Sequence, residues 1–207
     1  AIESMRILVL SRNASLYSTN RLVLTARARG HDISVIDPLS LQIVVARGAP
    51  RLSLAGERLP KFDVVIPRIG ASITRYGAAV LRQFEHTGTI VLNTAQAISQ
   101  TRDKVGMLQM LANQKVPVPR TVCTRSLAGV EAALELVGGY PAIIKLQQGA
   151  QGIGTMIAES PQSLYALLET LWAMGQEIVL QQYIKESRGR DVRAIVVDGK
   201  IVAAMRR

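Results

Sequence analysis

Short apolar segments alternate along the first ninety residues with longer stretches in which apolar residues recur at helical spacing. The apolar segments are 5–10, 33–36 and 64–66, and the helical stretches are 18–30 and 74–88. The first kind of pattern is typical of buried strands and the second of amphipathic helices. Strands that alternate with helices predict an open parallel sheet with flanking helices. The polar, glycine-containing stretch 47–62 predicts a β-hairpin inserted into this order.

After residue 93 the pattern predicts a second α/β unit built from two β-α-β passages. The predicted helices are 101–112, 126–137 and 160–174, and the predicted strands are 120–124, 142–146, 155–158 and 178–184. Thr94 or Thr101 is expected to cap the first helix. Asp198-Gly199 separates two alternating apolar runs, 191–197 and 201–205, and predicts a tight hairpin.

The composition places the chain among globular proteins and excludes several classes. Of its 207 residues 48% are hydrophobic, and it has a single cysteine. No apolar run reaches the ~20 residues of a membrane-spanning helix, so we expect a cytoplasmic protein with no membrane partner. One cysteine excludes an internal disulfide and a cysteine-cluster zinc site. We expect Cys123 to be a small buried strand residue.

The charge favours anionic partners without choosing among them. Lysine and arginine outnumber aspartate and glutamate by 25 to 15, a net charge of +10. Nucleotides, acidic peptides and RNA all fit this charge. Aromatic residues make up only 4% of the chain, which leaves few side chains on which bases could stack. We expect no direct DNA binding.

The stretch 138–155 carries the strongest chemical signal. An apolar strand contains one lysine, Lys145, and the glycine-rich loop 149–154 follows it. Glycine lets backbone N–H groups approach an anion, and a nearby lysine supplies the charge that a polyphosphate needs. Because the loop leads into another strand, 155–158, the segment differs from a P-loop, whose glycines open a helix. The alternative is a surface hairpin with a solvent-directed lysine.

Two arginines lie where ligands gather in parallel sheets. Arg12 follows the first strand and Arg68 follows the third, and carboxyl ends of parallel strands line the usual binding crevice. Both side chains are candidates to bind an anionic substrate. A nearby carboxylate or solvent would satisfy either guanidinium equally well.

The order of these segments resembles the ATP-grasp ligases. The matching motifs are Asp103-Lys104 at a helix start, Pro141–Lys145, the loop 149–154, Val179–Ile184, and Asp191-Val192-Arg193. The segments 10–18, 37–40 and 63–70 resemble the RimK type within that superfamily, whose founding member adds glutamate to the C-terminus of a small-subunit ribosomal protein. The resemblance covers residues 5–207. It implies an N-terminal domain over 5–93, a central grasp domain over 94–183, and the start of a C-terminal grasp domain over 184–207.

The resemblance also implies roles for single residues. Lys104 and Lys145 would hold the ATP phosphates, with Arg193 as a catalytic residue near the reacting phosphate. The other implied ATP-binding residues are Gln151, Gly152 and Gly154 in the loop, Gln181, Gln182, Tyr183 and Ile184 in the hinge between the two grasp domains, and Asp191. Gln182 departs from the glutamate that many relatives carry before the tyrosine.

The implied reaction activates a carboxylate with ATP and Mg²⁺ or Mn²⁺, forms an acyl-phosphate, and joins it to the amine of glutamate. An acidic protein or peptide would be the acceptor, for example a small-subunit ribosomal protein, and the enzyme would be a homo-oligomer. In relatives the metal ligands follow the region that matches this chain, so we expect no metal ligand within residues 1–207. We therefore expect these 207 residues alone to be inactive.

Two other interpretations stay open at this point. A regulator derived from such a ligase would bind nucleotide, ribosome or RNA without catalysis, but it leaves the lysine, loop and hinge series unexplained. A small-anion-binding α/β protein that uses Arg12 and Arg68 would explain only the first half of the chain.

Overall fold

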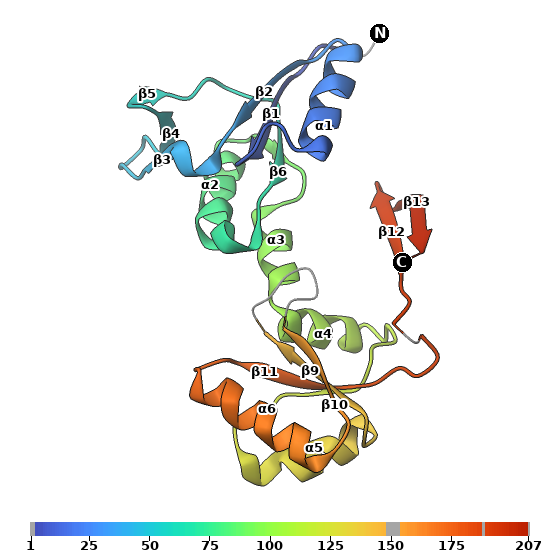
Figure 1. The fold of residues 1–207 in the computed structure, drawn as a ribbon. Coiled ribbons are helices and arrows are strands. Elements are labelled where there is room, and N and C mark those ends of the chain that lie inside the picture. The colour runs from blue at the N-terminus through green and yellow to red at the C-terminus, as the bar shows by residue number, and fades with distance from the viewer. Residues whose placement is uncertain (1–2, 148–153, 188, 207) are drawn as a thin grey trace. The chain divides into compact units, whose positions relative to one another are not determined.

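The computed structural model describes residues 3–147, 154–187 and 189–206. The chain divides into two units, Ala1–Met107 and Leu108–Arg207 (Figure 1). Each unit has its own sheet and its own buried core. Among the described helices none is long and apolar enough to span a membrane.

The N-terminal unit is built on a parallel four-stranded sheet with the order β2-β1-β6-β7. Its strands are β1 (Arg6–Ser11), β2 (Asp32–Ile36), β6 (Val64–Arg68) and β7 (Ile90–Val91). The parallel sheet predicted from the strand–helix alternation is confirmed. The predicted strand 64–66 extends to Arg68, which pairs with Ser11 at the end of β1.

Helices cover both faces of this sheet because β1 is apolar on both. Ile7 and Val9 pack with Ala26 of α1 (Tyr17–Ala28). Leu8 and Leu10 point the other way, into a core that they share with α2 (Thr74–His86) and with Ala95 of α3 (Ala95–Arg102). Both leucines are fully buried, and each such burial contributes about 1.5–3 kcal/mol.

The predicted hairpin over 47–62 is a larger element than expected. The structure has a three-stranded antiparallel sheet of β3 (Leu41–Val44), β4 (Arg51–Leu54) and β5 (Glu57–Arg58). Leu41 and Leu52 of this sheet are buried in the core under α2. The 3₁₀ turn Pro38–Ser40 joins β2 to β3, and a second, Ala71–Ile73, precedes α2. The prediction missed β3 because the turn signals of residues 47–50 mark only its end.

The second unit has a four-stranded sheet with the order β10-β9-β11-β8, in which all neighbours are antiparallel. Its strands are β8 (Thr121–Val122), β9 (Ala142–Leu146), β10 (Thr155–Ala158) and β11 (Ile178–Gln182). The order makes β8 parallel to β9 and β10 parallel to β11, each pair with one strand between. The two predicted β-α-β passages are therefore present and interleaved.

Helices α5 (Val130–Val137) and α6 (Pro161–Ala173) cover one face of this sheet (Figure 1). Their core contains Ala142 and Ile144 of β9 and Leu180 of β11. The predicted helix 126–137 begins with a 3₁₀ turn, Leu127–Gly129. The strands predicted over 120–124 and 178–184 are shorter than expected, since β8 contains only Thr121 and Val122 and β11 ends at Gln182, opposite Ala142 at the start of β9.

The first predicted helix of the second half is two helices. Thr94 caps α3, as one of the two capping predictions states, with its hydroxyl accepting from Ala97 N at 3.1 Å. Thr101 lies inside α3, so its predicted capping role is wrong. Asp103 separates α3 from α4 (Lys104–Asn113), and its carboxylate accepts from Gly106 N at 2.9 Å.

The last described element is the hairpin of β12 (Val192–Val197) and β13 (Lys200–Arg206). Asp198 and Gly199 form its turn with positive φ values of 50° and 71°, as the sequence predicts. Every described residue of both strands is exposed.

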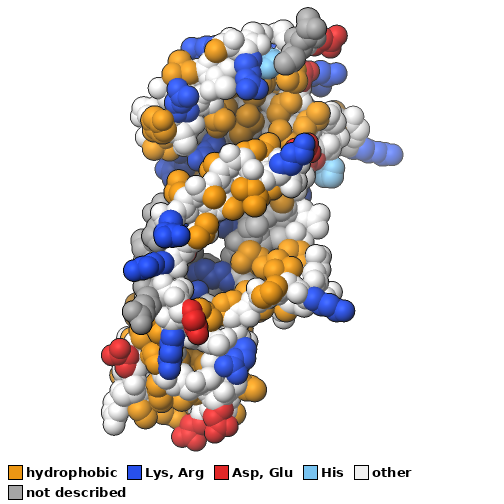
Figure 2. Space-filling model, turned by 90° about the vertical axis from the view of Figure 1, so that its right-hand side faces the viewer, with side chains coloured by type: hydrophobic (Ala, Val, Ile, Leu, Met, Phe, Trp, Pro, Cys, Tyr) orange, Lys and Arg blue, Asp and Glu red, His pale blue; other side chains and the backbone are white. Residues whose placement is uncertain are grey.

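The exposure of one side chain departs from the expectation. Cys123 is exposed just beyond β8, so the prediction of a buried strand cysteine is wrong. Strand β8 ends one residue earlier and leaves this side chain outside the sheet. On the face shown in Figure 2, lysine and arginine side chains lie at separate points among hydrophobic ones.

Candidate functional site

Lys145 is placed by the alternation of β9. Ala142 and Ile144 are fully buried against the helices, and Lys145 points to the opposite face of the sheet. It is half-buried there and pairs across β9–β11 with Val179. This placement follows from strand geometry, in which successive side chains point to opposite faces.

A chain of three hydrogen bonds fixes the lysine. Lys145 Nζ donates to Gln181 Oε1 at 2.6 Å. The amide Nε2 of Gln181 donates to Thr121 Oγ1 at 2.8 Å, and that hydroxyl donates to the carbonyl of Pro119 at 2.9 Å. Gln181 is only 6% exposed, so its amide orientation is set by these two partners. The network orients the ammonium group from the neighbouring strand.

Burial lowers the pKa of Lys145 below its ordinary value, because desolvation disfavours the charged form. The hydrogen-bond acceptor Gln181 is a neutral amide, so this bond does not neutralise the ammonium charge. A partly desolvated cation interacts more strongly with an anion than a fully solvated one does.

Gly154 lies where the glycine loop enters β10. Its carbonyl accepts from Leu146 N at 2.9 Å, and its φ is +82°. A Cβ at this position would lie 2.7 Å from Leu146 Cδ1, so both the backbone angle and the packing require glycine. Gln151 and Gly152, predicted to bind ATP, lie outside the described residues.

The predicted hinge segment is held by backbone pairing. Gln182 N donates to the carbonyl of Arg120 at 2.8 Å, and Arg120 N donates to Gln182 Oε1 at 3.2 Å. Gln182, the residue that departs from the family pattern, thus uses its side chain to extend pairing beyond β8. Tyr183 is half-buried and Ile184 is 37% exposed. The carbonyl of Ile184 accepts from Ser187 N and Oγ.

Lys104 is the half-buried first residue of α4. It belongs to the first unit and Lys145 to the second. The structure therefore defines the surroundings of each lysine separately. Asp103, beside Lys104, leaves no room for a side chain at Gly106, where a Cβ would lie 2.6 Å from Asp103 Oδ2.

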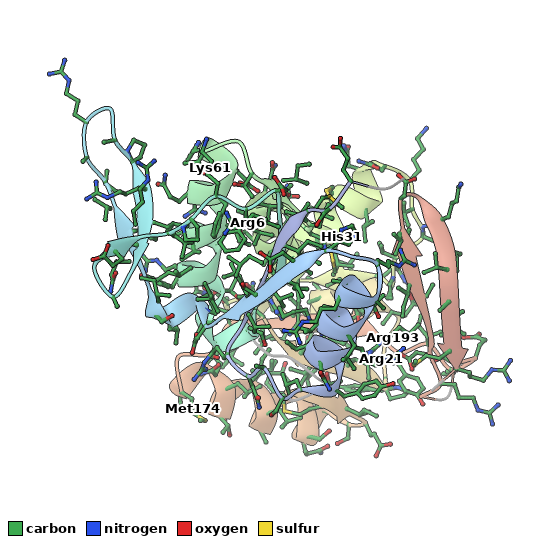
Figure 3. The ribbon with its side chains drawn as sticks, turned by 90° about the horizontal axis from the view of Figure 1, so that it is seen from above. Arg6, Arg21, His31, Lys61, Met174 and Arg193 are labelled. Carbon is green, nitrogen blue, oxygen red and sulfur yellow. The ribbon has the colours of Figure 1, made fainter. Side chains whose placement is uncertain are left out.

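Asp191 and Arg193 lie at the start of the β12–β13 hairpin. Both are exposed, and Arg193 pairs with Met205 in the hairpin register (Figure 3). Directly after the hinge segment, Lys185, Glu186, Ser187 and Arg190 line a hollow of about 490 Å³.

Arg12 and Arg68 lie at the carboxyl edge of the first sheet, as predicted from the parallel order. Arg68 pairs with Ser11, the residue before Arg12, and both arginines are exposed. Arg68 Nη2 donates to Ser18 Oγ at 3.1 Å. Ser11 Oγ lies 3.2 Å from Thr19 Oγ1 and links the strand end to α1. This edge combines two cations with hydroxyl groups, a set that suits a carboxylate ligand.

Thr121, Arg120 and Ser18 support the candidate residues, although no sequence motif indicated a role for any of them. Thr121 lies 60 positions from Gln181, and Ser18 lies 50 from Arg68. No local motif marks such partners, because the contacts join segments that are far apart in the sequence. Across the described ranges 3–147, 154–187 and 189–206, no group of three or more potential metal ligands gathers.

The family comparisons match both units. The RimK PreATP-grasp domain model matches residues 5–98, and the RimK-like ATP-grasp domain model matches residues 101–207. A probable alpha-L-glutamate ligase of Halorhodospira halophila is 46% identical over 203 residues, which is 98% of this chain and 67% of that protein.

Solved structures show the same fold. The RimK domain ATP-grasp protein of Sphaerobacter thermophilus aligns with a TM-score of 0.73 and 22% identity, over 96% of this chain and 71% of that one. The ATP-grasp ligase PsnB, complexed with a precursor peptide and AMPPNP, aligns with a TM-score of 0.71 and 22% identity, over 100% of this chain and 73% of its own. From its sequence matches over both units, this chain belongs to the RimK-like ATP-grasp ligase family.

Proposed function

We propose that this chain binds ATP beside Lys145 and serves an ATP-dependent ligation of glutamate to a carboxylate acceptor. The observation that carries the proposal is the Lys145–Gln181 pair on the sheet face opposite the helical core. A half-buried ammonium held by a neutral amide, next to a glycine-containing strand connection, suits a polyphosphate. The glutamate part rests on the name of the relative that is 46% identical.

In this proposal the lysines and the glycine loop divide the work of holding the phosphates. Lys145 neutralises phosphate charge from a fixed position, and Lys104 supplies a second cation from α4. The loop that ends at Gly154, including Gln151 and Gly152, covers the phosphates with backbone N–H groups and excludes water from the reacting centre.

The adenine would bind along the segment from Gln181 to Ile184. The backbone of Gln182 is already paired with Arg120, so we assign the adenine contacts within this segment chiefly to Tyr183 and Ile184. Asp191 would contact the nucleotide, and Arg193 would stabilise the negative charge that develops on the transferred phosphoryl group.

The proposed reaction proceeds in two steps. An acceptor carboxylate oxygen attacks the γ-phosphorus and ADP leaves, which gives an acyl-phosphate. The amine nitrogen of glutamate then attacks the acyl carbon, loses a proton, and phosphate leaves with the bonding electrons of the acyl C–O bond. Positive charge near the acceptor carboxylate and near the carboxylate of glutamate favours each step. We assign Arg12 and Arg68 to the binding of an acidic substrate.

Mg²⁺ or Mn²⁺ would supply positive charge that offsets the phosphate charge and polarises the γ-phosphoryl group in such a reaction. Since no cluster of three potential ligands gathers among the residues described, we assign no metal ligand there. The acceptor would be an acidic peptide or protein, such as a small-subunit ribosomal protein. The cytoplasmic location, the homo-oligomer and the inactivity of the 207 residues by themselves stay predictions.

Calorimetric titration with ATP, with and without Mg²⁺, tests the nucleotide site directly. We expect Lys145→Ala to weaken ATP binding by about tenfold or more, the loss that one charge-assisted hydrogen bond produces. Lys200→Ala removes an exposed lysine of the hairpin and serves as the matched control. Unchanged affinity in Lys145→Ala would refute the assigned role. If ATP fails to bind the unaltered chain in both conditions, the ligase-derived regulator becomes the better interpretation.

A further inference from the structure

A second pocket lies at the opposite edge of the N-terminal sheet from Arg12 and Arg68. It has a volume of about 450 Å³ and is bounded by residues just before β6 and β7, by the end of α2, and by β4 and β5. Strands β6 and β7 are parallel, so residues that precede them mark the amino ends of the strands. None of the residues assigned above to nucleotide or substrate lines this pocket.

The inner wall of the pocket is apolar and aromatic. Phe62 and Phe84, the two phenylalanines of the chain, both line it and are 8% and 4% exposed. Leu52 and the half-buried Leu59 complete this wall. Arg6 lies over the ring of Phe62, with its Cζ 5.7 Å from the ring centroid. Such a wall favours a flat, apolar body over a fully hydrated ion.

The rim of the pocket is cationic. Arg51 and Arg58 come from β4 and β5, and the exposed Lys61 follows them (Figure 3). The one carboxylate in the lining belongs to Asp63, whose Oδ2 accepts from the backbone N of Arg6 at 2.6 Å. Three cations against one hydrogen-bonded carboxylate leave the rim positive and suited to an anion.

Gln83 is an independent indication that this pocket binds a ligand. This lining residue of α2 is 7% exposed, and its Nε2 has no hydrogen-bond partner among the described residues. A buried amide donor without a partner costs about 1–3 kcal/mol. Nearly all buried donors in folded proteins are paired. Because this atom is covered from solvent, a ligand group would accept from Nε2, and remove this cost, once the Gln83 side chain turns toward the pocket.

We propose that this pocket binds a small organic anion built on a flat apolar ring. The ring packs against Phe62 and Phe84, the anionic group is held by Arg51, Arg58 and Lys61, and a polar atom of the ligand accepts from Gln83. Aromatic carboxylates have this chemistry. The site is separate from the proposed nucleotide site, since it is formed entirely by residues 50–90.

Calorimetry of the full chain with 2-naphthoate tests the proposal, with neutral 2-naphthamide and inorganic phosphate as paired probes. We expect saturable binding of naphthoate, and binding at least roughly tenfold weaker for the other two, because each lacks either the charge or the ring. Equal affinity for naphthoate and naphthamide, or no saturable binding of naphthoate, would overturn the proposal.

Variants locate the binding site. Arg58→Gln and Lys61→Gln change exposed side chains and should each weaken naphthoate about fivefold, whereas Arg75→Gln, on the exposed side of α2, should leave it unchanged. Gln83→Leu should weaken binding by a similar factor without lowering the melting temperature. Equal binding by all four variants, or displacement of naphthoate by ATP, would place the probe elsewhere and refute the assignment.

Discussion

Lys145 and Gln181 are joined by a hydrogen bond of 2.6 Å although they are 36 positions apart. They lie diagonally across β9 and β11, since Lys145 pairs with Val179 and Gln181 pairs with Ile143. One side chain is the cation proposed to hold ATP phosphates, and the other fixes its direction. The proposed ATP binding and the stability of the fold therefore depend on the same pair of side chains.

Gln181→Leu should lower the free energy of unfolding by about 1–3 kcal/mol, because Lys145 loses its acceptor and Thr121 loses a donor. Urea denaturation of the variant measures this loss. Gln162→Leu, on an exposed position of α6, should change stability by less than about 0.5 kcal/mol. Equal stability of the two variants would show that the hydrogen-bond network contributes little.

The pKa of Lys145 is lowered by burial, which fixes the sign of a pH effect. Between its folded-state pKa and the ordinary value of 10.5, the unfolded chain binds more protons at this residue than the folded chain does. The contribution of Lys145 to stability therefore rises with pH across that window. Denaturation of the unaltered chain and of Lys145→Met at a series of alkaline pH values measures it. An NMR titration that placed the pKa of Lys145 at or above 10.5 would contradict the prediction.

Gly154→Ala should destabilise the second unit for two reasons. The φ of +82° costs a residue with a Cβ about 1–2 kcal/mol, and the new methyl group would lie against Leu146 Cδ1. Gly175→Ala has φ +69° with nothing within 4 Å of the new Cβ, so it isolates the backbone cost. Thermal unfolding should show the larger loss in Gly154→Ala. A matching loss in both variants would mean that Leu146 moves aside.

Arg68→Gln tests the proposed substrate edge of the N-terminal sheet. Loss of one charge-assisted contact should raise the KM for an acidic acceptor peptide by roughly tenfold and leave the Kd for ATP unchanged. Ser18→Ala removes only the hydroxyl that accepts from Arg68 at 3.1 Å and should have a smaller effect on KM. These values come from ligation kinetics in a preparation that is active with glutamate. A change in ATP affinity with an unchanged KM would assign Arg68 to the nucleotide instead.

The sequence alone determined the features that depend on local pattern. The apolar run from Ile7 to Leu10 predicted a buried strand. Strand alternation puts Lys145 on the face opposite Ile144, and Asp198-Gly199 predicted the last hairpin. Each of these follows from backbone geometry within a few residues. The family resemblance came from the order of such segments, and the comparisons confirmed it.

Only the tertiary structure decided the partners of those residues. Thr121 reaches Gln181 and Arg120 reaches Gln182 through strand pairing between positions about 60 apart. The pocket that contains Phe62, Phe84 and Gln83 exists because the β3–β5 sheet packs beside α2. Sequence periodicity tells which face of an element is apolar, but not which distant element covers it, since that is set by the free energy of packing the whole core.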